Sequence, residues 1–134
     1  MLNQARERVV SIKRVTLVLL VLAVVSACAR LQLYEGPEQS RSEVARIIAD
    51  PKINAGLPMV AVLREVDDRV INWNVNTVDV LPGEHRLLVD CEIGSSTTRF
   101  EIKVKAIAGY RYRTQIEVAP GNHVCQNVTL VESY

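Results

Sequence analysis

The chain has 134 residues, of which 49% are hydrophobic and 23% are charged. This length suits one domain and is too short for two of ordinary size, and the apolar fraction is too high for a disordered chain. A formal net charge of +1 gives no general attraction to nucleic acid, so no nucleic-acid partner is expected.

The first 27 residues have the pattern of a secretory signal peptide. An apolar run over residues 15–25 is followed by Ser26 and Ala27 and preceded by four basic residues, Arg6, Arg8, Lys13 and Arg14. A basic segment, a short apolar core and small residues at the end are typical of such signals. The run is shorter than the ~20 apolar residues of a transmembrane helix. We therefore expect export, with residues 1–27 forming a signal-peptide helix.

The end of this segment, Val25-Ser26-Ala27-Cys28, resembles a bacterial lipobox, although Val25 stands where Leu is usual. The resemblance implies cleavage after Ala27 and acylation of Cys28, so that membrane lipid is a partner through this residue. Several acyl chains anchor a protein stably, whereas one myristoyl chain does so marginally. Because Ala29 is not Asp, the usual sorting pattern places the protein at the periplasmic face of the outer membrane rather than the inner one. The alternative is an uncleaved signal anchor with an incidental Cys.

Two further cysteines, Cys91 and Cys125, lie outside the signal. An even number in an oxidising compartment favours a disulfide, which would close about 35 residues and stabilise the fold by roughly 3–4 kcal/mol. Two free buried thiols are the alternative. No metal or other cofactor is expected, because there is no CxxC and the histidines lack ligand spacing. Cys125 is out of phase with its apolar neighbours, so a bridge requires a bulge or a sheet edge there.

The remaining chain is predicted to contain a tether and then strands. Residues 28–42 have little periodicity and read as a lipidated linker. Strands are expected over residues 44–49 (or a helix capped by Ser42), 59–66, 69–73 and 77–80, with a loop between the first two. Asp67-Asp68 is a turn signal, and residues 81–84 (Leu-Pro-Gly-Glu) form a tight connection.

The C-terminal half gives the clearest strand pattern. Apolar and polar residues alternate over residues 86–93, 99–106 and 110–118, Gly-bearing turns separate these runs, and a last strand covers residues 124–131. This pattern predicts an antiparallel meander with one buried and one solvated face. About seven strands within residues 43–134 indicate an all-β domain, either an antiparallel β-sandwich or a small open barrel.

Several short motifs resemble those of a group of small uncharacterised proteobacterial lipoproteins. They are Tyr34-Glu35-Gly36-Pro37, Glu43-Val44-Ala45, Leu81-Pro82-Gly83-Glu84-His85 and Ala108-Gly109-Tyr110-Arg111-Tyr112. The L-P-G-x-H motif, expected to form a hairpin, is also similar to that of PEGA-type and transthyretin-like β-sandwich modules. The resemblance implies the fold and the envelope location, and it assigns no site residues.

A basic surface is the strongest candidate for binding. Five basic residues occupy the outward phase of two consecutive strands and would share one face in a hairpin: Arg99, Lys103, Lys105, Arg111 and Arg113. Such a face could bind lipid headgroups, a glycan phosphate or an acidic protein. The alternative is a solvated sheet face with cross-strand ion pairs. Trp73 is a candidate interface anchor if exposed, and otherwise a core residue.

Catalytic signals are weak. The chain has no G-x-S-x-G, H-E-x-x-H or phosphate-loop motif. His85 follows a turn and is expected to pack on it or to pair with a carboxylate, and His123 has a similar setting. Asp67 and Asp68 fit a turn better than a catalytic carboxylate pair. The protein is therefore not expected to be an enzyme.

Three classes of function remain at this stage. The first is a non-catalytic envelope lipoprotein that binds or scaffolds another envelope protein. The second is a binder of an anionic glycan or lipid through the basic face, including proteins like lysozyme inhibitors. The third and least favoured is a hydrolase that would use His85 and His123.

Overall fold

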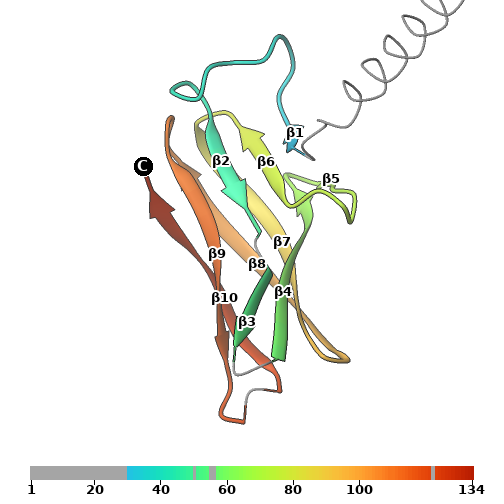
Figure 1. Cartoon of the computed structure of the whole chain (residues 1–134). Coiled ribbons are helices and arrows are strands. Elements are labelled where there is room, and N and C mark those ends of the chain that lie inside the picture. The colour runs from blue at the N-terminus through green and yellow to red at the C-terminus, as the bar shows by residue number, and fades with distance from the viewer. Residues whose placement is uncertain (1–29, 50, 55–56, 122) are drawn as a thin grey trace, which may run out of the picture.

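The computed structural model describes residues 30–49, 51–54, 57–121 and 123–134, in which every regular element is a strand. Ten strands form two sheets that pack face to face as a β-sandwich (Figure 1). The predicted all-β fold is confirmed, and the sandwich rather than the open barrel is correct. The predicted signal peptide and Cys28 lie outside the described residues.

Sheet A contains five strands in the order β1–β6–β2–β9–β10. Their bounds are β1 Arg30–Gln32, β6 Thr77–Val80, β2 Ala45–Ile48, β9 Arg111–Val118 and β10 Cys125–Ser133. Two of its four strand pairs are antiparallel, β2 with β6 and β9 with β10, and two are parallel, β1 with β6 and β2 with β9. The first and the last strands of the described residues thus both belong to sheet A.

Sheet B has the order β3–β4–β7–β8, and β5 pairs with β4. The strands are β3 Pro51–Asn54, β4 Leu57–Val66, β7 Gly83–Ile93, β8 Ser96–Ala106 and β5 Arg69–Val70. A two-residue turn joins β4 to β5, and its residues Asp67 and Asp68 have φ angles of 48° and 66°. Positive φ at both positions suits the twist of a tight hairpin, which confirms the predicted turn.

The N-terminal strands differ in part from the prediction. The strand expected over residues 44–49 is β2, and the helix alternative is wrong. The predicted loop before β4 contains an additional strand, β3. The segment predicted as a tether already belongs to sheet A from Arg30, because Arg30 and Gln32 pair with Thr77 and Asp79. Leu31 packs against the core, but a strand of three residues is too short to show a period in the sequence.

The chain crosses between the two sheets at two connections, and these make the predicted L-P-G-x-H hairpin and the predicted meander wrong. Residues 81–82 lead from β6 in sheet A to β7 in sheet B, so the L-P-G-x-H motif is not a hairpin. The chain crosses again between β8 in sheet B and β9 in sheet A. At this second crossing the buried Tyr112 hydroxyl accepts a hydrogen bond from the Ile107 backbone N–H (3.0 Å) and donates one to the Lys105 carbonyl oxygen (3.3 Å). A tyrosine that holds a crossover in this way is a recurrent device in Greek-key sandwiches.

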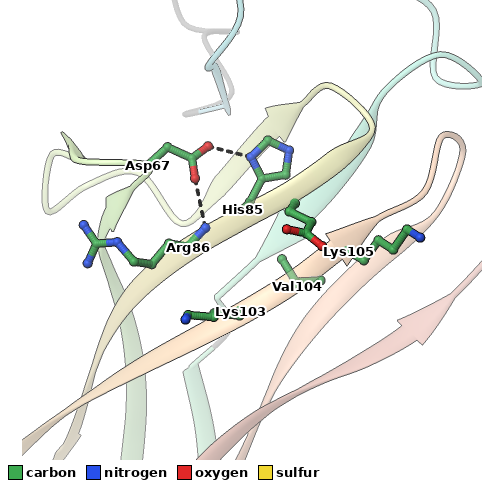
Figure 2. A pocket seen from close by; sticks show the side chains of 7 residues that line it. Asp67, His85, Arg86, Lys103, Val104 and Lys105 are labelled. Carbon is green, nitrogen blue, oxygen red and sulfur yellow. Dashed lines mark hydrogen bonds and ion pairs between the residues drawn. The ribbon is translucent and has the colours of Figure 1, made fainter.

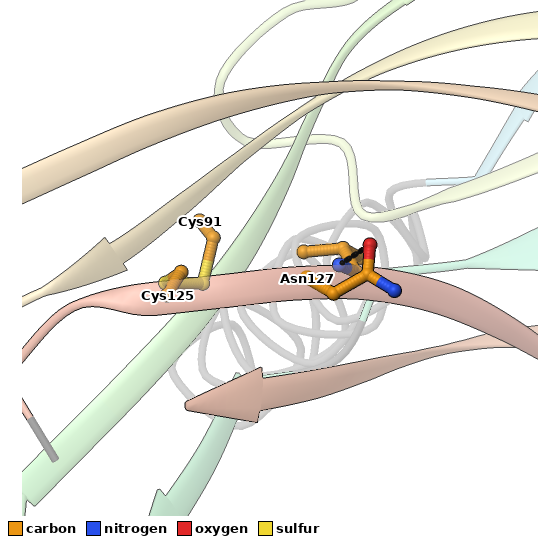
Figure 3. The surroundings of a disulfide bond; sticks show 4 residues. Cys91, Cys125 and Asn127 are labelled. Atoms are coloured by element: carbon orange, nitrogen blue, oxygen red, sulfur yellow. Dashed lines mark hydrogen bonds between the residues drawn. A yellow bond between two sulfur atoms is a disulfide. The ribbon is translucent and has the colours of Figure 1, made fainter. Parts of the chain in front are cut away.

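A disulfide between Cys91 on β7 and Cys125 on β10 joins the two sheets (Figure 3). Both residues belong to the core, with exposed fractions of 0% and 6%. The register of β10 against β9 shifts between Cys125 and Asn127, which is the bulge that the sequence required. The free-thiol alternative is therefore wrong. The bulge turns Cys125 inward while Val128 also faces the core.

Candidate functional site

The basic face predicted from the sequence is divided between the two sheets. Its five residues are all exposed, as the alternation predicted. However, Arg99, Lys103 and Lys105 lie on β8 in sheet B, whereas Arg111 and Arg113 lie on β9 in sheet A. Outward side chains of two packed sheets point in opposite directions, so the prediction of one shared face is wrong. Strand alternation shows which side chains face solvent, but it does not show which strands are neighbours.

Arg99 is held by a buried carboxylate on the outer face of sheet B. Asp90, 4% exposed, accepts hydrogen bonds from Arg99 Nε (2.7 Å) and Nη2 (3.0 Å) and from Arg64 Nε (2.7 Å). The hydrogen bonds from Arg99 lower the pKa of Asp90, against the opposing effect of burial, and Arg64 lowers it further. Arg99 therefore belongs to a cross-strand ion-pair network that stabilises sheet B.

This network should make stability depend on pH in the acid range. Because the folded-state pKa of Asp90 is depressed, its contribution is fully present above the unfolded-state pKa of about 4 and is lost as the pH falls through the folded-state value. We expect Asp90→Asn to be less stable than wild type at neutral pH, with the difference shrinking below about pH 4. Urea unfolding of both proteins between neutral pH and about pH 3 measures this difference in stability, and Glu101→Gln serves as an exposed control. If the stability difference between wild type and Asp90→Asn stayed constant below about pH 4, the ion pairs of Asp90 would not be its source.

Sheet A carries a larger cationic surface on its outer side, which we call the arginine face. It consists of residues from four parts of the chain: Arg30, Arg41, Arg46, Arg111 and Arg113. Asp79 lies at its centre and is 4% exposed. It accepts hydrogen bonds from Arg46 Nε (2.7 Å) and Nη2 (3.0 Å), and Arg30 Nε is 3.2 Å from its carboxylate. Arg46 in turn lies opposite Asp79 on one side and Arg111 on the other.

Positive charge is in excess on the arginine face. Arg30 and Arg46 contact Asp79, and Arg30 also pairs with Glu38. By contrast, Arg111 makes no ion pair with a described residue, and Arg41 Nη1 is buried without a hydrogen-bond partner in that part of the chain. Burial lowers the pKa of Arg41, and the nearby cations of Arg46 and Arg111 lower it further. Unpaired guanidinium groups held close together make this surface suited to an anion.

A second site lies at one end of sheet B, in an open groove of about 490 Å³ beside His85 (Figure 2). His85 Nδ1 is 2.6 Å from Asp67 Oδ2, and its Nε2 is 2.7 Å from the Leu81 carbonyl oxygen. The Arg86 backbone N–H donates to the other oxygen of Asp67 (2.9 Å). Although burial opposes it, hydrogen bonding by His85 and Arg86 lowers the pKa of Asp67. The predicted pairing of His85 with a carboxylate is confirmed.

The contacts of His85 join the turn after β4 to the segment that leads into β7. Both ring nitrogens of His85 already contact acceptors, so neither is directed at the groove. His123 cannot complete a catalytic pair with it. His85 lies six residues before Cys91 on β7, about 20 Å along an extended strand, whereas His123 lies two residues before Cys125, the disulfide partner of Cys91. Within the described residues no cluster of three or more His, Cys, Asp or Glu side chains could hold a metal ion.

Trp73 is exposed, so the core alternative is wrong. Its exposed fraction is 83%, and nearby Val70 is 76% exposed. Together they present apolar surface beside the short strand β5. An exposed Trp is compatible with the predicted role as an interface anchor.

The open side of the sandwich contains a groove that the sequence did not indicate. Strand β8 ends sheet B and β10 ends sheet A, and a groove of about 440 Å³ runs between these two edges. Its walls include Ile102 and Lys103 from β8 and Thr129 and Leu130 from β10. Only the pairing of strands distant in sequence decides which ones become edges, so no local pattern could have located it.

Backbone directions show which groups of β8 face this groove. The Arg86 carbonyl accepts a hydrogen bond from the Asp67 N–H on the β4 side. The backbone N–H and C=O groups of the odd-numbered residues of β7 therefore point toward β8. His85 pairs with Val104, so the backbone groups of the even-numbered residues of β8 bond to β7. The backbone groups of the odd-numbered residues of β8 point to the free edge of the sheet. The hydrogen bonds of the Tyr112 hydroxyl to Lys105 and Ile107 agree with this assignment. Lys103 therefore directs its N–H and C=O to the free edge.

Comparison with protein-family models, with curated proteins and with solved structures finds no match to this chain. In the described part of the chain, no helix is long and apolar enough to cross a membrane.

Proposed function

We propose that this protein is a lipid-anchored envelope protein whose non-catalytic β-sandwich binds a protein partner. The signal sequence and lipobox support export and acylation of Cys28, with the periplasmic face of the outer membrane as the location. The Cys91–Cys125 disulfide is typical of an oxidising compartment. The engagement of both His85 nitrogens and the distance to His123 argue against the hydrolase hypothesis.

The observation that carries partner binding is the pair of free strand edges beside the groove. An edge strand offers unpaired N–H and C=O groups to which an extended segment of another protein can add. On β8 these groups include those of Lys103, while half-buried Ile102 and Leu130 provide apolar contacts. The exposed charges of Lys103 and Lys105 oppose pairing between identical copies. They also favour a partner segment with acidic side chains.

A proline at position 103 tests this proposal. The Lys103 N–H faces the free edge, so Lys103→Pro removes a donor for the partner but none of the hydrogen bonds to β7. We expect a photoreactive residue at Thr129 to crosslink a second protein in intact cells, and Lys103→Pro to abolish that adduct. Lys103→Gln, which keeps the N–H, should retain it in large part.

Circular dichroism and thermal unfolding of each variant separate loss of binding from loss of folding. Recovery of only the uncrosslinked chain in wild-type cells would refute partner binding at this edge. An adduct that survives in the folded Lys103→Pro variant would also refute strand addition to β8.

A further inference from the structure

The distance between the proposed anchor and the fold is very short, and the inference below rests on that anchor. Strand β1 begins at Arg30, which is hydrogen-bonded into sheet A beside Thr77. Cys28 precedes it by two residues, and two residues of extended chain span at most about 7 Å. An acyl group on Cys28 would therefore hold the β1 edge of sheet A at the membrane surface, with no flexible spacer between them.

The arginine face starts at this same edge. Arg30 belongs to β1, and the face continues through Arg46 on β2 to Arg111 and Arg113 on β9. Asp79, buried beneath it, holds the guanidinium groups of Arg30 and Arg46 in place. The buried Nη1 of Arg41 has no acceptor among the described residues, and Arg111 lies beside Arg46. The sheet whose β1 edge would meet lipid thus carries an excess of positive charge on its outer face.

We propose that the arginine face binds the phosphate groups of anionic phospholipids and holds sheet A against the membrane that anchors Cys28. Guanidinium groups bind phosphate through paired hydrogen bonds, and a basic residue near an anionic membrane strengthens binding about fivefold. Asp79 orients Arg30 and Arg46, and Arg41 and Arg111 supply further positive charge for the lipid. The groove between β8 and β10 lies at the opposite edge of sheet A from β1, away from the anchor.

The test uses the full chain, processed and acylated in cells and reconstituted into vesicles. A nitroxide at Ser133, which lies opposite Arg111 and is exposed, reports on the outer face of sheet A. A nitroxide at Thr97 reports on the outer face of sheet B. In vesicles containing phosphatidylglycerol, the Ser133 label should be shielded from a neutral nickel chelate in water, and the Thr97 label should stay accessible. In pure phosphatidylcholine both labels should be accessible.

Paired substitutions distinguish this surface from general charge attraction. Arg41→Gln with Arg111→Gln removes two cations and leaves Arg30 and Arg46, which contact Asp79, in place. It should lower the ratio of shielded to accessible protein roughly 25-fold. Lys103→Gln with Lys105→Gln removes the same charge from sheet B and should leave the ratio unchanged. High salt should release the face without releasing the protein from the vesicle.

The outcomes separate the membrane contact from the anchor. Flotation with neutral vesicles reports the acyl anchor alone, whereas shielding that requires phosphatidylglycerol reports the arginine face. A Ser133 label that stays accessible in both kinds of vesicle would overturn the proposed contact and leave the anchor standing. The proposed contact would also be overturned if the Lys103→Gln, Lys105→Gln variant lost as much shielding as the Arg41→Gln, Arg111→Gln variant. Failure to float with neutral vesicles would refute the anchor and, with it, this contact.

Discussion

Replacing Cys91 and Cys125 together with alanine is expected to lower the free energy of unfolding by about 3–4 kcal/mol. The bridge links residues 34 positions apart and joins β7 of sheet B to β10 of sheet A. Its loss restores freedom to the unfolded chain, which is the main source of the effect. Urea unfolding of the oxidised protein and the double variant measures the difference.

Single substitutions provide the control for the disulfide. Cys91→Ala and Cys125→Ala each break the same bond, so each should cost about as much as the double variant, and their effects should not add. Wild-type protein unfolded under reducing conditions should behave in the same way. A double variant within about 1 kcal/mol of wild type would show that the bridge contributes little.

Tyr112→Ala is expected to cost about 3–5 kcal/mol, a value typical of a large aromatic residue removed from a core. Tyr112 is 0% exposed, and its hydroxyl contacts the backbone at Lys105 and Ile107 across the crossover from β8 to β9. Tyr112→Phe keeps the ring and loses these hydrogen bonds, so it should cost about 1–2 kcal/mol. Thermal or urea unfolding of both variants separates packing from hydrogen bonding.

Tyr110 offers a matched control for Tyr112. It lies two residues earlier on the same crossover, is half-buried and packs against exposed Tyr134, with ring centroids 4.4 Å apart. Tyr110→Phe should change stability by less than about 0.5 kcal/mol. Equal losses in Tyr110→Phe and Tyr112→Phe would contradict a special role for the Tyr112 hydroxyl.

Much of the fold could be predicted because strand alternation reflects burial directly. Leu87, Val89 and Cys91 face the core as their spacing indicated, and the phase of Cys125 correctly required a bulge. The division into two sheets could not be predicted, because strands of the same period can form a hairpin or cross between layers. This ambiguity accounts for both errors, the expected L-P-G-x-H hairpin and the expected meander.

The candidate site was only partly predictable for a related reason. Arg111 and Arg113 were identified from their outward phase on a long strand. Arg30 and Arg41 lie in a segment without periodicity, and Arg46 lies on a short strand that the sequence did not connect to β9. The parallel pairing of Arg46 with Arg111 assembles this surface, and it depends on tertiary contacts rather than on local sequence.

The β2–β9 pairing also sets an order for folding. Strand β9 lies between β2 and β10 in sheet A, although it is one of the last strands to be synthesised. Until residue 113 is available, β2 lacks one of its two neighbours, so an incomplete chain cannot close this layer. Sandwiches with such non-local contacts typically fold in milliseconds to seconds, which is slow enough to suit the proposed export of an unfolded chain.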